Sequence, residues 1–290
     1  MSFSLTAALQ EITMPADSTV RYVLRRSCVK RLISVIVLLS CSVLFAGDDY
    51  ASKKKFIEEK YADQKPTQFG MYLSGVKTHI KTDRKIIALT FDGCGGSGGK
   101  GFDRELIRYL TENKIPATLF VTTSWIGYNE AVFKELLKNP NFDIQNHGFN
   151  HKPATVKGQV VWGIRGTLSV GDCFDEFEKS ARAFEKIAGR RPLFYRPGTA
   201  YFDEVGIKIL GDTGQVPMNF SGVIGDADRA LSLSTVEKFI RQNVHPGAVL
   251  IMHFNHPEGK TLKAVQDTLP EIRKAGYEFV KLIDYRDSLE

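Results

Sequence analysis

From Lys85 to the C-terminus, short apolar segments rich in β-forming residues alternate with segments whose apolar residues recur at helical spacing. Turn and capping residues separate the two kinds of segment. Strands that alternate with helices pair in parallel, because each helix returns the chain to the same end of the sheet. The sequence therefore predicts an α/β fold whose parallel sheet is either open or closed into a barrel.

The predicted strands cover residues 85–91, 117–122, 142–146, 191–196, 216–224, 248–253 and 277–282. The first predicted helix follows Asp103. The other predicted helices cover residues 131–138, 171–188, 202–210, 234–243 and 262–272. We expect Asp103 to cap the first helix, Gly189 to end the long third helix, and Ser234–Glu237 to form a capping box. Pro270 is expected to break or restart the last helix.

The N-terminal part has the pattern of an export segment. Residues 32–47 carry no charge and are almost wholly apolar, and Asp48 and Asp49 follow them. Basic residues precede the apolar stretch, namely Arg21, Arg25, Arg26, Lys30 and Arg31. The stretch is shorter than the roughly 20 residues that span a bilayer, which favours a cleaved signal peptide over a short membrane anchor. We therefore divide the chain into a signal or anchor (1–47), a connector (48–85) and a catalytic domain (86–290).

Charge and composition limit the partners. The chain has 39 basic and 33 acidic residues, a formal net charge of +6. It has no basic stripe interleaved with aromatic residues, so a nucleic-acid partner is not expected. The sequence predicts an exported protein of the periplasm or cell envelope that meets the membrane only through its N-terminal segment.

The body of the chain contains two cysteines. Cys28 and Cys41 lie in the export segment, and Cys94 and Cys173 lie beyond it. The latter two could form a disulfide in an oxidising compartment or could both be free.

Polar residues gather where the predicted strands end. They are Asp92, His147, His151, Arg196, Asp226, Asp228 and His253. The carboxyl ends of parallel strands meet at one face of an α/β fold, and sites are built there. Each residue alone has a structural interpretation, such as a turn cap or a surface ion pair. Together they predict one functional site.

The two histidines indicate the chemistry of this site. Three residues separate His147 from His151, so one helical turn or a tight loop can present both imidazoles to one metal ion. Such a site needs a third ligand, usually a carboxylate, and an open position for water. The glycine-rich loop at 93–99 lacks the Lys-Ser/Thr of a phosphate-binding loop, and we interpret it as a flexible rim.

Five short motifs occur in the order known from one enzyme family. They are Thr90-Phe91-Asp92-Gly93, His147-Gly148-Phe149-Asn150-His151, Arg196-Pro197-Gly198, Gly225-Asp226-Ala227-Asp228-Arg229 and Ile251-Met252-His253. Over about residues 86–284 the chain resembles polysaccharide deacetylases of the NodB-homology type, carbohydrate esterase family 4. The resemblance implies a distorted (β/α) barrel that hydrolyses the N-acetyl groups of amino-sugar polysaccharides such as peptidoglycan.

The resemblance also implies a role for each matched residue. His147 and His151 would bind a divalent metal, most commonly zinc. Asp92 would be the general base, and Arg196 would orient it. His253 would be the general acid, tuned by Asp226 or Asp228.

Three positions depart from the family pattern. The second aspartate of the first motif, a metal ligand in the family, is Gly93, which has no ligand atom. The second proline of the Arg-Pro-Pro motif is Gly198, and the tryptophan of the fourth motif is Arg229.

Gly93 leaves three explanations open. Asp92 could become the third ligand beside His147 and His151. Another side chain could complete the shell, the candidates being Asp103, Cys94 and His256. Alternatively the metal is absent, and the barrel hydrolyses another small or cyclic amide or only binds glycan. We favour metal-dependent deacetylation, because the positions of the base, the acid and the arginine are all retained.

Overall fold

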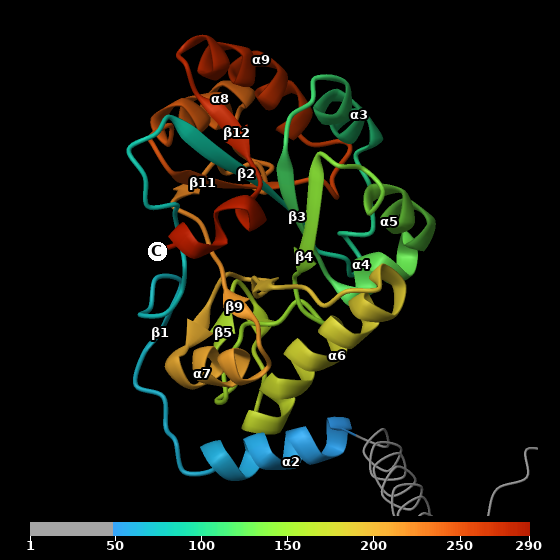
Figure 1. Ribbon diagram of the computed structural model, residues 1–290, viewed down its shortest axis with the longest axis vertical. Helices are drawn as coiled ribbons and strands as arrows, with labels where there is room; N and C mark the ends of the chain where they lie inside the picture. The colour runs from blue at the N-terminus through green and yellow to red at the C-terminus, as the bar shows by residue number, and fades with distance from the viewer. Residues whose placement is uncertain (1–48) are drawn as a thin grey trace, which may run out of the picture. The chain divides into compact units, whose positions relative to one another are not determined.

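The structure is a computed structural model that describes residues 49–290 (Figure 1). The predicted export segment, residues 1–47, lies outside the described residues. Within residues 49–290, no helix combines the length and apolarity needed to cross a bilayer. The chain divides into two compact units, Met1–Lys53 and Lys54–Glu290, and helix α2 (Asp49–Tyr61) contains the boundary.

A parallel sheet forms the centre of the second unit. Its strand order is β10-β11-β2-β3-β4-β7-β9, and every neighbouring pair is parallel. The strands are β2 (Ile86–Gly93), β3 (Ala117–Val121), β4 (Phe142–Asn146), β7 (Phe194–Tyr195), β9 (Val216–Pro217), β10 (Gly222–Val223) and β11 (Ala248–His253). The predicted parallel α/β fold is confirmed.

The sheet curls into an incomplete barrel. Strands β9 and β10 lie at opposite edges of the sheet, yet only residues 218–221 join them. Since an extended chain advances at most about 3.6 Å per residue, the two edges must lie close together. Strand β12 (Glu278–Val280) pairs with residues 86–88 of β2. It lies on the same side of β2 as β3, which pairs with the later residues 90–93. The predicted distorted (β/α) barrel is therefore confirmed.

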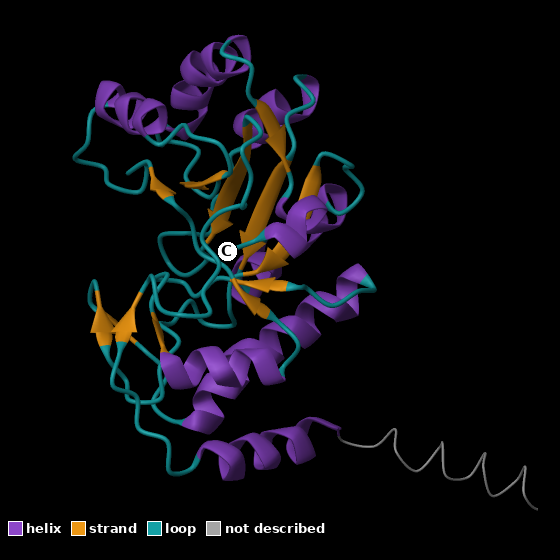
Figure 2. Cartoon of the chain, turned by 60° about the vertical axis from the view of Figure 1, so that its left-hand side comes forward, coloured by secondary structure: helices purple, strands orange, loops and turns teal. Residues whose placement is uncertain are grey.

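Helices cover the outer face of the curled sheet (Figures 1 and 2). They are α3 (Arg104–Glu112), α4 (Thr123–Tyr128), α5 (Glu130–Leu136), α6 (Val170–Ala188), α7 (Glu204–Asp212), α8 (Leu233–Gln242) and α9 (Thr261–Lys274). Asp103 caps α3 by accepting a hydrogen bond from the Leu106 amide, and Gly189 ends α6 with φ of 69°. Both caps were predicted, because aspartate and glycine fit these positions.

Two predicted helix features are wrong. Ser232, not Ser234, caps α8, because its hydroxyl accepts a hydrogen bond from the Thr235 amide at 3.1 Å. Pro270 neither breaks nor restarts α9. The proline is exposed, and the buried side chains of Leu269 and Ile272 on either side of it keep the helix packed.

Short elements complete the fold. The segment predicted as a connector contains β1 (Phe69–Gly70), which pairs antiparallel with β8 (Phe202–Asp203). Val76 and Ile80 of the same segment are buried. Strands β5 (Val160–Val161) and β6 (Ile164–Arg165) form a hairpin, and a 3-10 helix, η1 (Leu282–Ser288), lies near the C-terminus.

The alternation of side chains along β2 decides which residues reach the barrel interior. Ile87, Leu89 and Phe91 belong to an apolar cluster that includes residues of the surrounding helices and is called the outer cluster below. Ile86 and Ala88 belong to the second, inner cluster. Because side chains alternate between the two faces of a strand, Thr90 and Asp92 continue the inner row. Strand β11 aligns with β2 so that His253 pairs with Asp92.

The outer cluster gives a stability prediction. Leu89→Ala, at a fully buried side chain, should lower the free energy of unfolding by about 2–5 kcal/mol, because a cavity remains. Leu168→Ala is the matched control: this leucine is 54% exposed, and its loss should change stability by less than about 0.5 kcal/mol. Urea denaturation measures both, and equal losses would contradict the assigned core.

Candidate active site

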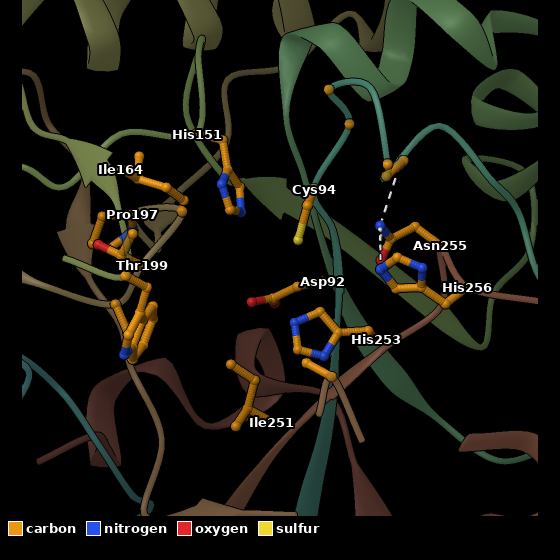
Figure 3. Close-up of a pocket in the computed structure, with 18 of the residues that line it drawn as sticks. Asp92, Cys94, His151, Ile164, Pro197, Thr199, Ile251, His253, Asn255 and His256 are labelled. Carbon is orange, nitrogen blue, oxygen red and sulfur yellow. Dashed lines mark hydrogen bonds between the residues drawn. The ribbon is translucent and has the colours of Figure 1, made fainter. Parts of the chain in front are cut away.

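The C-terminal ends of the strands surround a cavity of about 620 Å³ (Figure 3). Its wall combines polar side chains from strand ends and loops with an apolar side. The polar members are Asp92, Cys94, Ser97, His151, Thr199, Asp226, His253, Asn255 and His256. Residues that are far apart in the sequence thus face one space, as expected for a site at this end of a parallel sheet.

A buried ion pair fixes the orientation of Asp92. Nη1 of Arg196, a residue with no exposed surface, donates to Asp92 Oδ1 at 2.7 Å and to Thr90 Oγ1 at 3.0 Å. Nη2 donates to the carbonyl oxygen of Asn219 at 2.9 Å, and the guanidinium lies 4.1 Å from the centre of the Phe120 ring. Burial lowers the pKa of Arg196, and the Asp92 carboxylate opposes that shift. One oxygen of Asp92 is therefore held while Oδ2 remains available.

His147 is oriented by a backbone group. Its Nδ1 lies 2.9 Å from the carbonyl oxygen of Arg196, which can only accept, so Nδ1 carries the proton. In the neutral ring, Nε2 then presents a lone pair, 3.5 Å from Asp92 Oδ2 and 3.8 Å from Cys94 Sγ. Burial lowers the pKa of His147, but the charge of Asp92 and the contact with Cys94 raise it by more. These surroundings favour a positive charge beside Nε2.

His151 provides a test of whether a metal fits. Its Nε2 is buried and has no hydrogen-bond partner among residues 49–290. Its ring centre lies 5.0 Å from that of His147. Ligand atoms of His147, His151 and Cys94 all lie within 4.8 Å of one another. A buried nitrogen without a partner is costly, and a cation at this point would satisfy it.

Gly198 makes room for His151. A Cβ atom on Gly198 would lie 2.3 Å from His151 Cγ and 2.5 Å from its backbone carbonyl carbon. His151 itself has φ of 59°, an uncommon conformation for a residue other than glycine. The departure from the family's second proline is thus explained by the space that this histidine occupies.

His253 and Asp226 form the second ion pair of the cavity. Nδ1 of His253 lies 3.1 Å from Asp226 Oδ1, and the His253 amide donates to Asp226 Oδ2 at 2.7 Å. Thr261 Oγ1 donates to the same Oδ2 at 2.8 Å. Burial lowers the pKa of His253, but the Asp226 carboxylate outweighs burial and the pKa lies well above its usual value. Nε2 of His253 can therefore carry a proton at neutral pH.

The structure does not bring every predicted residue to the cavity. Asp228 is exposed, and its Oδ1 accepts a hydrogen bond from the Ala230 amide at 2.8 Å. Arg229 is also exposed and pairs with Glu258 at 2.7 Å. Asp103 caps α3. None of these three lines the cavity.

Gly93 cannot present a ligand in this backbone. A Cβ atom there would lie 2.9 Å from Phe254 Cζ and 3.4 Å from Trp125, because residue 93 faces these two rings, which pack against each other. The next residue, Cys94, lines the cavity. Burial raises the pKa of the Cys94 thiol, but the histidines His151, His147 and His253 lower it well below its usual value.

The two cysteines of the body do not form a disulfide. Cys94 and Cys173 are both free. Cys173 is fully buried in α6, and burial raises its pKa well above the usual value. The two residues therefore differ in chemistry, because histidines surround Cys94, whereas burial outweighs the hydrogen bond from Thr167 at Cys173.

Sequence reasoning missed the apolar wall of the cavity. Trp162, at the tip of the β5–β6 hairpin, is 71% exposed and lines the cavity with Met71, Ile164 and Phe220. The Trp162 ring packs edge-on against Tyr201, with ring centres 5.7 Å apart. Strands of two residues have no measurable periodicity, so the available signal was a tryptophan beside a turn glycine, Gly163.

Comparison with known proteins agrees with this geometry. Residues 79–217 match the family model described as polysaccharide deacetylase. The chain is 25% identical over 207 residues to a peptidoglycan-N-acetylglucosamine deacetylase of Bacillus cereus, covering 71% of this chain and 90% of the relative.

Solved structures share the fold. A carbohydrate esterase family 4 pseudoenzyme from Bacillus anthracis has a TM-score of 0.62 and 20% identity over 73% of this chain and 69% of its own. A family 4 acetyl xylan esterase from Clostridium thermocellum, in complex with a cobalt ion, has a TM-score of 0.55 and 20% identity over 69% of this chain and 90% of its own.

The close approach of Gly198 to His151 can be tested by substitution of the glycine. Gly198→Ala should displace His151 and lower the affinity for a divalent metal about 10–100-fold, the usual cost of disturbing the support of a ligand. Gly211→Ala, where no atom lies within 4 Å of the added carbon, should leave affinity unchanged. Competition with a chromophoric chelator measures both variants. Unchanged affinity in the Gly198 variant would contradict a metal-binding role for His151.

Proposed function

We propose that this polysaccharide deacetylase, whose residues 79–217 match the family model, removes N-acetyl groups from peptidoglycan or a similar amino-sugar polysaccharide of the cell envelope. The observation that carries the proposal is the convergence of three chemical units in one cavity. They are a histidine pair with an unpartnered nitrogen, a carboxylate held by a buried arginine, and an imidazole paired with a carboxylate. The export pattern of residues 1–47 and the peptidoglycan relative support the location.

A divalent metal, zinc in our proposal, would be bound by His147 and His151. When bound, such an ion lowers the pKa of a water ligand towards ~7 and polarises the acetyl carbonyl. The pair fits the ion, because one Nε2 has its lone pair directed by the Arg196 carbonyl and the other is buried without a partner. Members of this family are metalloenzymes, and the cobalt-bound relative supports the assignment.

Asp92 and His253 would transfer the protons. Asp92 Oδ2 accepts the proton of the attacking water, while Arg196 prevents the carboxylate from turning away. The amine is a poor leaving group until it is protonated, and His253 supplies that proton. Asp226 keeps His253 charged and fixes its ring. The two groups lie on paired residues of neighbouring strands, so they can act on one bond.

The apolar wall is suited to a sugar ring. Pyranose rings have faces of C–H groups that pack against aromatic rings, and Trp162 exposes such a ring at the cavity. The catalytic groups line the other side. A polymer could thus rest on the wall while its acetamido group reaches Asp92 and His253.

Two alternatives remain distinguishable by experiment. One is an inactive glycan-binding module, since one structural relative is a pseudoenzyme. The other is metal-free hydrolysis of a small or cyclic amide. Retention of both ion pairs, Asp92–Arg196 and His253–Asp226, favours catalysis over the first. The unpartnered nitrogen of His151 favours a metal over the second.

Acetate release from N-acetylglucosamine oligomers and from purified peptidoglycan tests the function. Asp92→Asn and His253→Gln should each lower kcat by about 10²–10⁴-fold, because each removes a proton-transfer group. Asp228→Asn, a loop carboxylate outside the cavity, should keep the activity of the unchanged protein. Glycan binding without acetate release by the zinc-loaded unchanged protein would leave the binding module as the explanation.

The apolar wall can be tested separately. Trp162→Ala should raise KM for oligomers several-fold and change kcat little, because it removes binding area away from the reacting atoms. Tyr128→Ala is the control, since Tyr128 is 57% exposed but does not line the cavity. Initial rates across a range of chain lengths measure the effect. Equal KM values for the two variants would exclude Trp162 as a sugar-binding residue.

A further inference from the structure

We infer that Cys94 is the third protein ligand of the metal ion, so that the site is a thiolate-dihistidine site selective for zinc over magnesium and manganese. The inference rests on the proposed metal dependence of the site and identifies the ligand that replaces the missing aspartate.

The positions of the three candidate ligand atoms suit one ion. Cys94 Sγ lies 3.8 Å from His147 Nε2, and the ligand atoms of Cys94, His147 and His151 all lie within 4.8 Å of one another. With Zn–N of about 2.0–2.1 Å and Zn–S of about 2.3 Å, tetrahedral ligand atoms stand roughly 3.3–3.6 Å apart. A small contraction would close the site. Figure 3 shows the Cys94 sulfur and the His151 ring directed into the same space.

The backbone explains why the ligand moves one residue along the chain. Asp92 faces the interior and Gly93 faces Phe254 and Trp125, so a side chain at 93 has no route to the metal. Strand β2 ends at Gly93, and Cys94 is the first residue of the loop. The Cys94 carbonyl oxygen accepts a hydrogen bond from Thr122 Oγ1 at 2.9 Å, which holds the turn in place.

Among residues 49–290, the other candidate ligands do not converge with both His147 and His151. Asp92 Oδ1 is bound by Arg196, and the described residues that converge as possible ligands do not include Asp92. Asp103 caps α3. His256 lies 3.5 Å from Glu258 and beside Asn255, on another side of the cavity. With Cys94 as ligand, Asp92 remains free to act as the base.

A thiolate changes which metals the site prefers. Sulfur ligands favour zinc and other soft or borderline ions, whereas carboxylates suit magnesium and manganese. Three protein ligands with one open position are also the usual arrangement of catalytic zinc. The replacement of a carboxylate by Cys94 therefore narrows the metal range without closing the position that water needs.

Cobalt(II) substitution of the purified full-length protein tests this inference without measuring activity. The unchanged protein and Cys173→Ser, the matched control, should show a near-ultraviolet sulfur-to-cobalt charge-transfer band. Cys94→Ser should lose the band and bind zinc at least 10-fold more weakly. Cys94→Asp should bind without the band and gain manganese affinity relative to zinc. A band that persists in Cys94→Ser, or is missing from stoichiometric cobalt protein with Cys94 intact, would overturn the assignment.

Alkylation of the unchanged protein gives a second measurement in case the Cys94 variants do not fold. Zinc should slow the reaction of Cys94 with iodoacetamide at least 10-fold, as read by peptide mass spectrometry. An unprotected Cys94 in zinc-loaded protein would refute ligation. These outcomes are independent of acetate release: a cobalt–sulfur band in a protein that releases no acetate would end the proposed function and leave the ligand assignment standing.

Discussion

The buried ion pair between Arg196 and Asp92 is the interaction on which the site depends. An arginine without solvent contact is stable only when its charge and its donors are all satisfied. Here the partners come from β2 and from the segment that joins β9 to β10, so the guanidinium links distant parts of the curled sheet. Removing one partner of such a pair costs about 3–5 kcal/mol. Barrel geometry and the orientation of the base are therefore set by the same contacts.

The ion pair between Arg196 and Asp92 also determines where the other charged groups of the cavity lie. Asp92 stays beside His147 and His151, where its negative charge favours the binding of a cation. His253 is paired with a separate carboxylate, Asp226, and its pKa is raised. The two proton-transfer groups are adjacent in the sheet but have different electrostatic partners. That separation allows one to accept a proton while the other holds one.

Much of this arrangement could be predicted from the sequence. Strands β2, β4 and β11 are continuous segments that are wholly or mostly buried and bounded by turn signals, and the carboxyl ends of parallel strands must meet. These two features of the sequence are enough to predict that Asp92, His147 and His253 lie together. Helix α6 was equally clear, because its apolar residues keep helical phase up to Gly189.

Other features depend on local geometry that a pattern does not contain. Residue 93 or residue 94 can face the cavity, depending on where the alternation of side chains along the strand stops. Here residue 93 faces Phe254 and Trp125, so residue 94 is the one at the cavity. The choice between Asp226 and Asp228 likewise turns on the course of one loop. The two-residue strands on either side of the turn that carries Trp162 are too short to show periodicity.

A crystal structure of the zinc-loaded protein, with data collected at the zinc absorption edge, would locate the ion and identify its ligands. We expect one anomalous peak about 2.0–2.3 Å from nitrogens of His147 and His151 and from Cys94 Sγ, with Asp92 still bound to Arg196. An anomalous peak elsewhere, or an Asp92 that has left Arg196 to bind the ion, would contradict it.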